Sequence, residues 1–254
     1  MDRNTLIKQW LAEEQSAHIH GWDFSHLDGR YEEENDLPWD YRETIRRYLT
    51  PTSRLLDLDT GGGEFLLSLG HPHHLTAATE AYPPNVALCK ETLTPLGIDF
   101  READSVDPLP FANASFDMVI NRHGEYVPDE IARVLKPGGL FITQQVGADN
   151  DRALVELLLD HPPALPFPDQ RLDIATRKFE LAGFTLLEGQ EAYRPIRFWD
   201  VGALVWFARI IVWEFPGFSV EGCLKGLLRA QALLEEKGVI EGTTHRFLLV
   251  ARKA

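Results

Sequence analysis

The chain has 254 residues, of which 44% are hydrophobic and 25% charged. This composition is that of a folded globular protein and excludes a disordered or fibrous chain. The formal net charge is −14, and residues 190–254 carry nine basic and seven acidic side chains, so the acidic excess lies in residues 1–189. A protein that grips a phosphate backbone normally presents a basic face, so nucleic acid is disfavoured as a partner.

The cysteines and the apolar segments indicate the cellular compartment in which the protein is expected. Two cysteines, Cys89 and Cys223, cannot make a disulfide framework and favour a reducing compartment. Residues 1–15 have scattered charges and no apolar stretch, unlike a secretory signal. The longest apolar run, residues 201–212, is broken by Arg209 and too short to span a bilayer. We therefore expect a cytoplasmic protein without membrane contact.

The first fifty residues lack a strand pattern. Their apolar spacing predicts helices over residues 5–16 and 39–49. We expect residues 1–50 to form an N-terminal helical segment that packs on a main domain formed by residues 51–254.

From residue 54 onward, short β-rich runs alternate with helical ones. This alternation predicts βαβ units, and hence an α/β fold with a doubly wound, mostly parallel sheet of seven strands. The predicted strands are residues 54–58, 75–79, 100–103, 116–120, 140–143, 184–187 and 244–251, and the predicted helices between them are residues 64–69, 85–93, 131–135, 152–159 and 171–182.

A long insertion, residues 190–242, separates the last two predicted strands, where a short turn would suffice. Trp199, Trp206 and Trp213 recur every seventh residue in it, a spacing that predicts one stripe along a helix. Two interpretations stay open. The insertion either buries its aromatic side chains as a helical hairpin, or covers the acceptor of a reaction and shapes an apolar pocket for it.

A glycine triplet, Gly61–Gly63, follows the first predicted strand and precedes a helix. Glycine at such a turn lets a ligand approach the backbone and the free N–H groups of the helix start. Taken alone, the triplet is also compatible with a purely structural turn, which is the alternative interpretation.

Polar residues at the ends of the next three strands strengthen the case for a ligand. A carboxylate at Glu80 can accept both hydroxyls of a ribose. The carboxylate of Asp104 can accept an exocyclic amino group of a purine, and Asn121 follows the fourth strand. Because ligands of open α/β sheets bind at the carboxyl ends of the strands, these residues predict a site for a nucleoside-containing cofactor.

A dinucleotide-dependent oxidoreductase is the main competing interpretation. Its loop has the pattern G-x-G-x-x-G, and Leu66 stands where the third glycine belongs. Asp57 and Asp59 flank the loop and would repel a pyrophosphate but suit a cation. The loop therefore favours a cationic cofactor.

Three stretches resemble the class I S-adenosylmethionine-dependent methyltransferases with a compact, single-domain catalytic core. They are LLDLDTGGGEFLLSL, EADSVDPLPFANASFDMVINRHGEY and IARVLKPGGLFITQQ, and Arg133–Gly139 is the most specific part. The resemblance covers residues 40–147, 176–188 and 243–252. It implies S-adenosyl-L-methionine as cofactor and S-adenosylhomocysteine as product, bound by Asp57, Gly61, Gly63, Glu80, Tyr82, Asp104, Ser105 and Asn121.

The same resemblance implies a role for each of these residues. Gly61 and Gly63 pass the methionine and ribose parts close to the backbone, and Asp57 orients the amino end. Glu80 holds the ribose hydroxyls, and Tyr82 lies against the adenine or ribose.

The adenine is expected at Asp104 and the backbone of Ser105, and the methionine part beside Asn121. One position departs from the family pattern, since Asp59 stands where a glycine is usual.

His123, just beyond the fourth predicted strand, is the candidate catalytic residue. In methyl transfer from a sulfonium the protein mainly aligns the acceptor, and a base is needed only if the acceptor must lose a proton. A histidine here could equally cap the loop. The run His71-Pro72-His73-His74 has no partner at ligand spacing, so we expect a solvated turn and no metal site.

The sequence therefore predicts S-adenosylmethionine-dependent methyl transfer to a small-molecule acceptor. Two alternatives stay open: methylation of ribosomal or transfer RNA, and a protein that binds the cofactor without transferring a methyl group.

Overall fold

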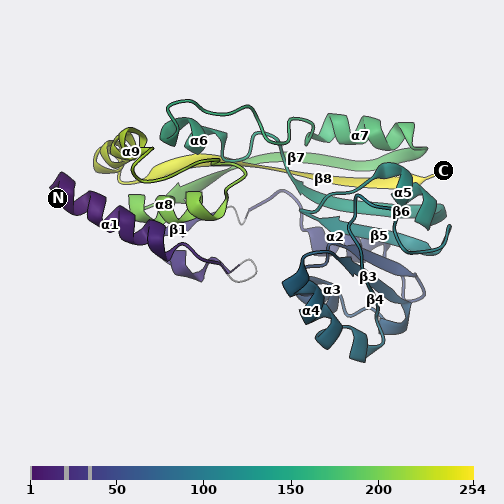
Figure 1. The fold of residues 1–254 in the computed structure, drawn as a ribbon. Coiled ribbons are helices and arrows are strands. Elements are labelled where there is room, and N and C mark those ends of the chain that lie inside the picture. Colours follow the sequence, from purple (N-terminus) through teal and green to yellow (C-terminus); the bar gives the residue numbers. More distant parts are fainter. Residues whose placement is uncertain (1, 20–22, 34–35) are drawn as a thin grey trace. The chain divides into compact units, whose positions relative to one another are not determined.

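The computed structural model describes residues 2–19, 23–33 and 36–254 (Figure 1). The chain folds into two compact units, each assembled from three segments. Unit 1 comprises Met1–Leu37, Gly147–Pro168 and Tyr193–His245, and unit 2 comprises Pro38–Val146, Asp169–Ala192 and Arg246–Ala254. The N-terminal segment predicted as one piece, residues 1–50, is thus shared between the two units.

An eight-stranded sheet runs in the order β1-β7-β8-β6-β5-β2-β3-β4. The strands are β1 Tyr31–Glu32, β2 Leu55–Leu58, β3 Thr76–Glu80, β4 Asp99–Glu102, β5 Phe116–Arg122, β6 Leu135–Val146, β7 Phe184–Phe198 and β8 Ile240–Lys253. Strands β4, β3, β2, β5 and β6 are parallel, and β8 is antiparallel to β6. The predicted doubly wound, mostly parallel α/β sheet is confirmed. The additional strand, β1, pairs only Tyr31 and Glu32 with β7, which is too short to give a sequence period.

The strand order reverses between β2 and β5. From β2 the chain moves outward to β3 and β4, then returns to β5 on the other side of β2. Loops that leave β2 and β5 therefore diverge, and this switch point is where open α/β sheets bind ligands.

Unit 2 has helices on both faces of its strands. Successive residues of a strand point to opposite faces, so Leu56 and Phe141 pack in one core while Leu55 and Ile142 pack in the other. Helices α5 Pro128–Val134 and α7 Leu172–Leu181 cover the first face. The second face is covered by α2 Tyr41–Tyr48, α3 Glu64–Ser68 and α4 Pro83–Thr92. This three-layer arrangement fixes the edge from which the β2, β3, β4 and β5 loops emerge.

The segment Arg133–Gly139, the most specific part of the family resemblance, connects α5 to β6 in unit 2. Helix α5 ends at Val134, and β6 begins directly at Leu135 with an irregular register against β5. Lys136 Nζ donates to both carboxylate oxygens of Asp117 at 2.8 and 2.9 Å, and so ties the start of β6 to β5.

Unit 1 has a hydrophobic core of its own. Trp10, Leu27, Phe198 and Trp206 are buried in one cluster. They come from α1 Arg3–Ser16, the short turn Ser25–Leu27, β7 and α8 Val201–Ile210, and the cluster also takes in α6 Arg152–Leu158 and α9 Leu224–Lys237. In the described ranges 2–19, 23–33 and 36–254, every helix is too short or too polar to cross a membrane.

The predicted tryptophan stripe is wrong. Asp200 caps the start of α8 by accepting a hydrogen bond from the N–H of Ala203 at 2.8 Å, and the helix ends at Ile210. Trp199 and Trp213 therefore lie outside the helix and are exposed, whereas Trp206 is buried. A stripe from Trp199 to Trp213 would need a continuous helix of 15 residues, whereas α8 has 10.

Gly63 and Gly70 both have positive φ, but only Gly63 is also closely packed by a neighbouring side chain. A Cβ on Gly63 (φ +85°) would lie 2.7 Å from Leu93, whereas a Cβ on Gly70 (φ +67°) would meet nothing within 4 Å. Both alanine variants carry the strain of a left-handed backbone, about 1 kcal/mol, but only Gly63→Ala adds overpacking of a further 1–3 kcal/mol. We expect urea unfolding to show Gly63→Ala as clearly the less stable variant, and equal stabilities would contradict this packing.

Candidate functional site

The loop after β2 holds two aspartates in different environments. Asp57, at the end of β2, is 5% exposed, and its carboxylate accepts a hydrogen bond from Thr60 Oγ1 at 2.6 Å. Asp59 has a left-handed backbone (φ +54°), and its Oδ1 accepts a hydrogen bond from Ser105 Oγ at 2.6 Å. The Ser105 bond joins the β2 loop to the loop after β4.

Gly61 forms the open side of this loop. A Cβ added to it would meet nothing within 4 Å, so the space beside it is free for a ligand. Its N–H donates to Glu80 Oε2 at 2.9 Å, and its carbonyl accepts from Cys89 Sγ at 3.1 Å. Gly63, by contrast, is required by its packing on Leu93; a contact between Gly63 and the cofactor stays a prediction.

Glu80 is anchored at the end of β3. Its Oε1 accepts the backbone N–H groups of Ala81 and Tyr82, each at 2.9 Å. Its Oε2 accepts from Gly61 and, at 3.4 Å, from Asn85 Nδ2. Each carboxylate oxygen can accept two hydrogen bonds. Both hydrogen-bonding positions of Oε1 are therefore occupied. A ribose hydroxyl would donate to Oε2 in place of Asn85 Nδ2, whose hydrogen bond is long.

The other cofactor residues predicted near the adenine differ in exposure. Asp104 is exposed and accepts the N–H of Val106 at 3.1 Å, which shapes the β4 loop. Ser105 is 1% exposed, and its side chain is used by Asp59. The Tyr82 side chain is 59% exposed. The structure thus places these residues at the ends of β3 and β4, as the sequence predicts, with their cofactor contacts still a prediction.

The side chain of Asn121, in β5, is hydrogen-bonded to both neighbouring strands, β2 and β6. Its Nδ2 donates to the Leu58 carbonyl at 3.2 Å, and its Oδ1 accepts from Gln145 Nε2 at 2.6 Å. Because the side chain is fully buried and bonded within the protein, it fixes the ends of β2, β5 and β6. A Cβ at Gly124 would lie 2.8 Å from Asn121 Nδ2 and 2.4 Å from Asp59 Oδ2. Glycine at 124 therefore leaves room for the Asp59 carboxylate.

The site is strongly acidic. Burial raises the pKa of Asp57 to about 7, with the charges of Asp59 and Glu80 adding to the effect, while the Thr60 hydroxyl and Arg122 oppose it. Burial likewise raises the pKa of Asp59 to about 6, against the Ser105 hydrogen bond and with the charge of Glu80. A cation bound among these carboxylates would relieve both their burial and their mutual repulsion.

His123 lies at the end of β5 in a left-handed conformation (φ +61°). Gln144 Nε2 lies 3.3 Å from His123 Nε2, and Gln144 Oε1 accepts a hydrogen bond from Trp39 Nε1 at 2.8 Å. An indole N–H is only a donor, so it fixes the Gln144 amide with its N–H facing the histidine. His123 Nε2 is then the acceptor, and the ring proton sits on Nδ1.

The charge state of His123 follows from its surroundings. The ring is solvent-accessible, yet desolvation by neighbouring atoms, followed by the positive charges of Arg246 and Arg122, lowers the pKa of the imidazole below its ordinary value. At neutral pH the ring is therefore uncharged, the form that a general base requires.

Sequence reasoning missed the residues that hold this edge together. Tyr41 is buried, and its hydroxyl hydrogen-bonds the carbonyls of Asn121 and Ile142 at 2.9 and 3.2 Å. Trp39 and Gln144 orient His123, as described above. The signal available in sequence was the aromatic pair Trp39 and Tyr41 just before α2, which indicates packing but not these partners.

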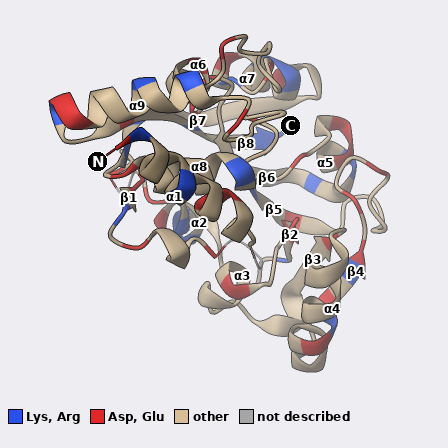
Figure 2. Ribbon diagram, turned by 60° about the vertical axis from the view of Figure 1, so that its left-hand side comes forward, with Lys and Arg blue, Asp and Glu red and all other residues tan. Residues whose placement is uncertain are grey.

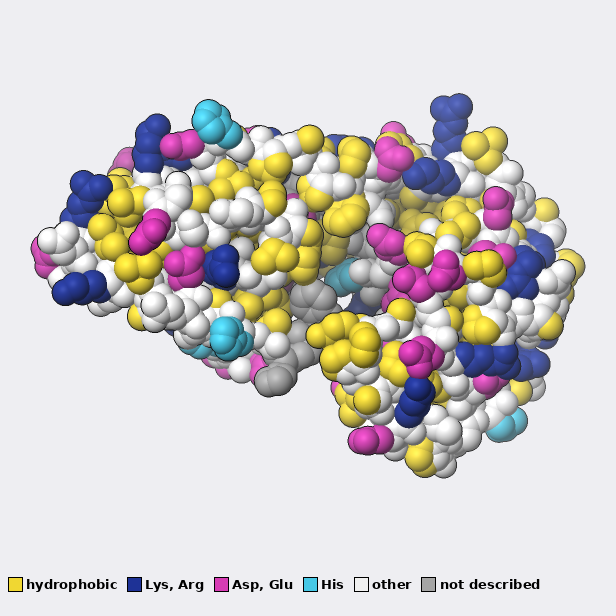
Figure 3. Space-filling model, in the orientation of Figure 1, with side chains coloured by type: hydrophobic (Ala, Val, Ile, Leu, Met, Phe, Trp, Pro, Cys, Tyr) yellow, Lys and Arg dark blue, Asp and Glu magenta, His cyan; other side chains and the backbone are white. Residues whose placement is uncertain are grey.

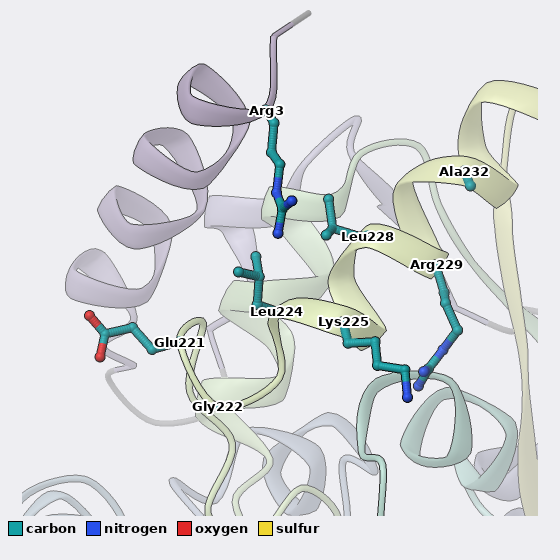
Figure 4. A pocket seen from close by; sticks show the side chains of 8 residues that line it. All are labelled: Arg3, Glu221, Gly222, Leu224, Lys225, Leu228, Arg229 and Ala232. Atoms are coloured by element: carbon teal, nitrogen blue, oxygen red, sulfur yellow. The ribbon is translucent and has the colours of Figure 1, made fainter.

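Other candidates lie apart from the site. His71 is buried, and its Nε2 donates to the Ser53 carbonyl at 2.7 Å. Within the described residues, three or more His, Cys, Asp or Glu side chains nowhere gather in a way that could hold a metal ion. A hollow of about 650 Å³ in unit 1 lies between α1 and α9 (Figure 4), and its lining residues include none of the predicted site residues.

Comparisons with known proteins bear on the fold and on residues 56–143. A family model described as a methyltransferase domain matches residues 56–143. Comparison with curated proteins gives no match. A putative methyltransferase from Bacillus halodurans C-125 superposes with a TM-score of 0.58 at 18% identity, over 84% of this chain and 98% of that chain.

Two further solved structures share the fold. A functionally unknown protein from Deinococcus radiodurans R1 gives a TM-score of 0.62 at 16% identity, over 99% of this chain and all of that chain. The YcgJ protein from Bacillus subtilis gives 0.57 at 19% identity, over 84% of this chain and 97% of that chain.

The fold is the Rossmann-like α/β fold that these solved structures share, and residues 56–143 match a methyltransferase domain. This domain match supports an enzyme that carries out S-adenosylmethionine-dependent methyl transfer.

The buried charge of Asp57 gives a pH-dependent stability. Its pKa is about 7 in the folded protein, against an ordinary value of 3.8. At pH 5 the folded state already holds the proton, whereas at pH 8 the buried carboxylate is ionised and costs stability. The unfolded chain, with a pKa near 3.8, is already largely ionised at pH 5, so part of the cost is present there and the rest appears as the pH rises through 7. We expect Asp57→Asn to raise the free energy of unfolding of the cofactor-free protein at both pH values, and by roughly 1–3 kcal/mol more at pH 8 than at pH 5.

Urea unfolding at the two pH values measures this difference. Glu91→Gln removes an exposed carboxylate of α4 and is the control. A gain for Asp57→Asn that is the same at both pH values would contradict the assigned burial of charge.

The tautomer of His123 can be observed directly. Long-range proton–nitrogen NMR correlations should show Nδ1–H for His123 and Nε2–H for His71, whose Nε2 donates to a carbonyl. Gln144→Glu replaces the donor by an acceptor and should move the His123 proton to Nε2. An Nε2–H tautomer of His123 in the unmodified protein would contradict the Trp39–Gln144–His123 arrangement.

Proposed function

We propose that S-adenosyl-L-methionine binds in unit 2, at the carboxyl ends of β2, β3, β4 and β5, and that the acceptor is a small molecule. The observation that carries the cofactor site is the set of carboxylates around the open side of Gly61. Asp57, Asp59 and Glu80 are wholly or partly buried there, and they are close enough for the charges of Asp59 and Glu80 to raise the pKa of Asp57.

The residues present fit this cofactor on structural grounds. The free space beside Gly61 admits a ligand to the backbone. Glu80 Oε2 is oriented by the Gly61 N–H and offers an acceptor to a ribose hydroxyl. The buried carboxyl of Asp57, with its raised pKa, favours a ligand that bears positive charge, and the ammonium and sulfonium groups of the cofactor supply it.

The cofactor, when bound, supplies an electrophilic methyl group. The protein's part is to hold and orient. Glu80 fixes the nucleoside end, Asp57 the charged end, and Asn121 keeps the β2, β5 and β6 ends in register. An acceptor that must lose a proton could pass it to neutral His123, whose Nε2 would exchange the Gln144 hydrogen bond for one from the acceptor.

A small acceptor is supported by the charge distribution. The net charge is −14. Figure 2 shows basic and acidic positions interspersed along the ribbon, and on the face drawn in Figure 3 basic and acidic side chains are mixed. A phosphate backbone needs a basic track. The sequence also predicts that the insertion, residues 190–242, covers the acceptor, and this stays a prediction.

Binding of the cofactor tests the site. Calorimetry should show that Glu80→Gln weakens S-adenosylmethionine and S-adenosylhomocysteine alike, by about tenfold or more, because both carry the same ribose. Glu102→Gln, at the exposed end of β4, should leave both affinities unchanged. Unmodified protein that binds neither compound would sink the proposal.

The acceptor class is decided by a transfer assay. The protein is incubated with methyl-labelled cofactor and, separately, with small-molecule and RNA fractions of a cell extract. Mass spectrometry should find the label in the small-molecule fraction. Label in RNA alone would replace this proposal by RNA methylation, and label in neither fraction would favour a protein that only binds the cofactor.

A further inference from the structure

Asp59 is the position at which the chain departs from the family pattern, which has glycine there. The left-handed backbone (φ +54°) is one that Asp adopts more readily than most residues. The carboxylate is fixed on one side by Ser105 Oγ, 2.6 Å from Oδ1. On the other side Oδ2 occupies the space that a Cβ of Gly124 would need, 2.4 Å away. The carboxylate is thus placed by contacts with the loops after β4 and β5.

Those two loops are expected to bind different parts of the cofactor. The Asp104–Ser105 loop is expected at the adenine, and Asn121, whose amide nitrogen also borders Gly124, is expected at the methionine part. In S-adenosylmethionine the sulfur atom joins the adenosyl part to the methionine chain. With the cofactor bound in this way, a carboxylate between the two loops would lie near the sulfur.

Asp59 forms no salt bridge with any residue that the structure describes. Its Oδ1 accepts a hydrogen bond from the hydroxyl of Ser105, and Glu80, Asp104 and Glu125 add negative charge around it. Its side chain is partly buried, so water screens it incompletely and a nearby positive centre interacts with it more strongly than in bulk water.

We propose that Asp59 is a specificity-determining residue that favours the positively charged sulfonium cofactor over its uncharged thioether product. This inference rests on the proposed cofactor site. S-adenosylmethionine and S-adenosylhomocysteine differ by one methyl group and one positive charge. Adenine, ribose and amino-acid contacts are common to both, so only a group that faces the sulfur can separate their affinities strongly. A protein with Asp59 releases its product readily and is weakly inhibited by it.

The test is the ratio of two dissociation constants, that of S-adenosylhomocysteine over that of S-adenosylmethionine, measured by calorimetry at pH 7.5. Asp59→Asn keeps the shape and removes the charge, and Asp59→Gly restores the family residue. Both variants should lower the ratio by about tenfold, mainly through weaker binding of S-adenosylmethionine. Asp107→Asn removes an exposed charge two residues beyond Ser105 and should leave the ratio unchanged.

The outcomes separate this inference from the proposed function. Unmodified protein that binds neither compound overturns both. Binding of both compounds with a ratio that neither Asp59 variant changes overturns the role of Asp59 and leaves the cofactor site intact. Equal weakening of both compounds also overturns it, because Asp59 would then only shape the loop. A fall in the ratio for Asp107→Asn as well would reduce the effect to net charge and overturn it too.

Discussion

Negative charge held at the end of β2, where neither Asp57 nor Asp59 forms a salt bridge within the described residues, is the constraint on which the site depends. Asp57 is buried at the switch point of the sheet, and its pKa is raised by that burial. A carboxylate in such a place costs folding stability. The glycine loop, the anchored Glu80 and the Ser105–Asp59 hydrogen bond all arrange space and acceptors around this charge. The stability that the cofactor-free protein loses there is the free energy that a cationic ligand can recover on binding.

The two units have cores of different origin. In unit 2 the core follows from strand alternation, with helices on both faces of the parallel strands. In unit 1 the core gathers segments that are far apart in sequence. Arg30 ties them together, since its guanidinium donates to Asp200 before α8 and to Glu13 of α1 at 2.7–2.9 Å. The pKa of the Asp200 carboxyl is lowered by this arginine and by the α8 N–H groups, against the effect of its burial.

The sequence was sufficient to predict the helices and strands from their apolar periodicity, and the polar residues that follow the strands. Every predicted strand and helix from residue 54 to residue 187 has a counterpart in the structure, and so has the last strand. Glu80, Asp104 and Asn121 were placed at strand ends from their positions alone. The tryptophan stripe failed because a seven-residue repeat says nothing about where a helix starts, and Asp200 starts α8 after Trp199.

Contacts between distant segments were beyond the sequence. Nothing in residues 39, 123 and 144 by themselves indicates that Trp39 sets the amide of Gln144 and thereby the tautomer of His123. The same holds for Gly63, whose requirement comes from Leu93 thirty residues later, and for Gly124, which leaves space for Asp59. Such relations arise when loops meet at one edge of a sheet.

The central claim is that the cofactor binds at the strand ends of unit 2. An NMR titration of amide resonances with S-adenosylmethionine tests it most directly. We expect the amide resonances of Gly61, Ala81 and Ser105 to shift, while those of Leu224 and Leu228, in the hollow of unit 1, do not. Shifts confined to Leu224 and Leu228, or no shifts at all, would contradict it.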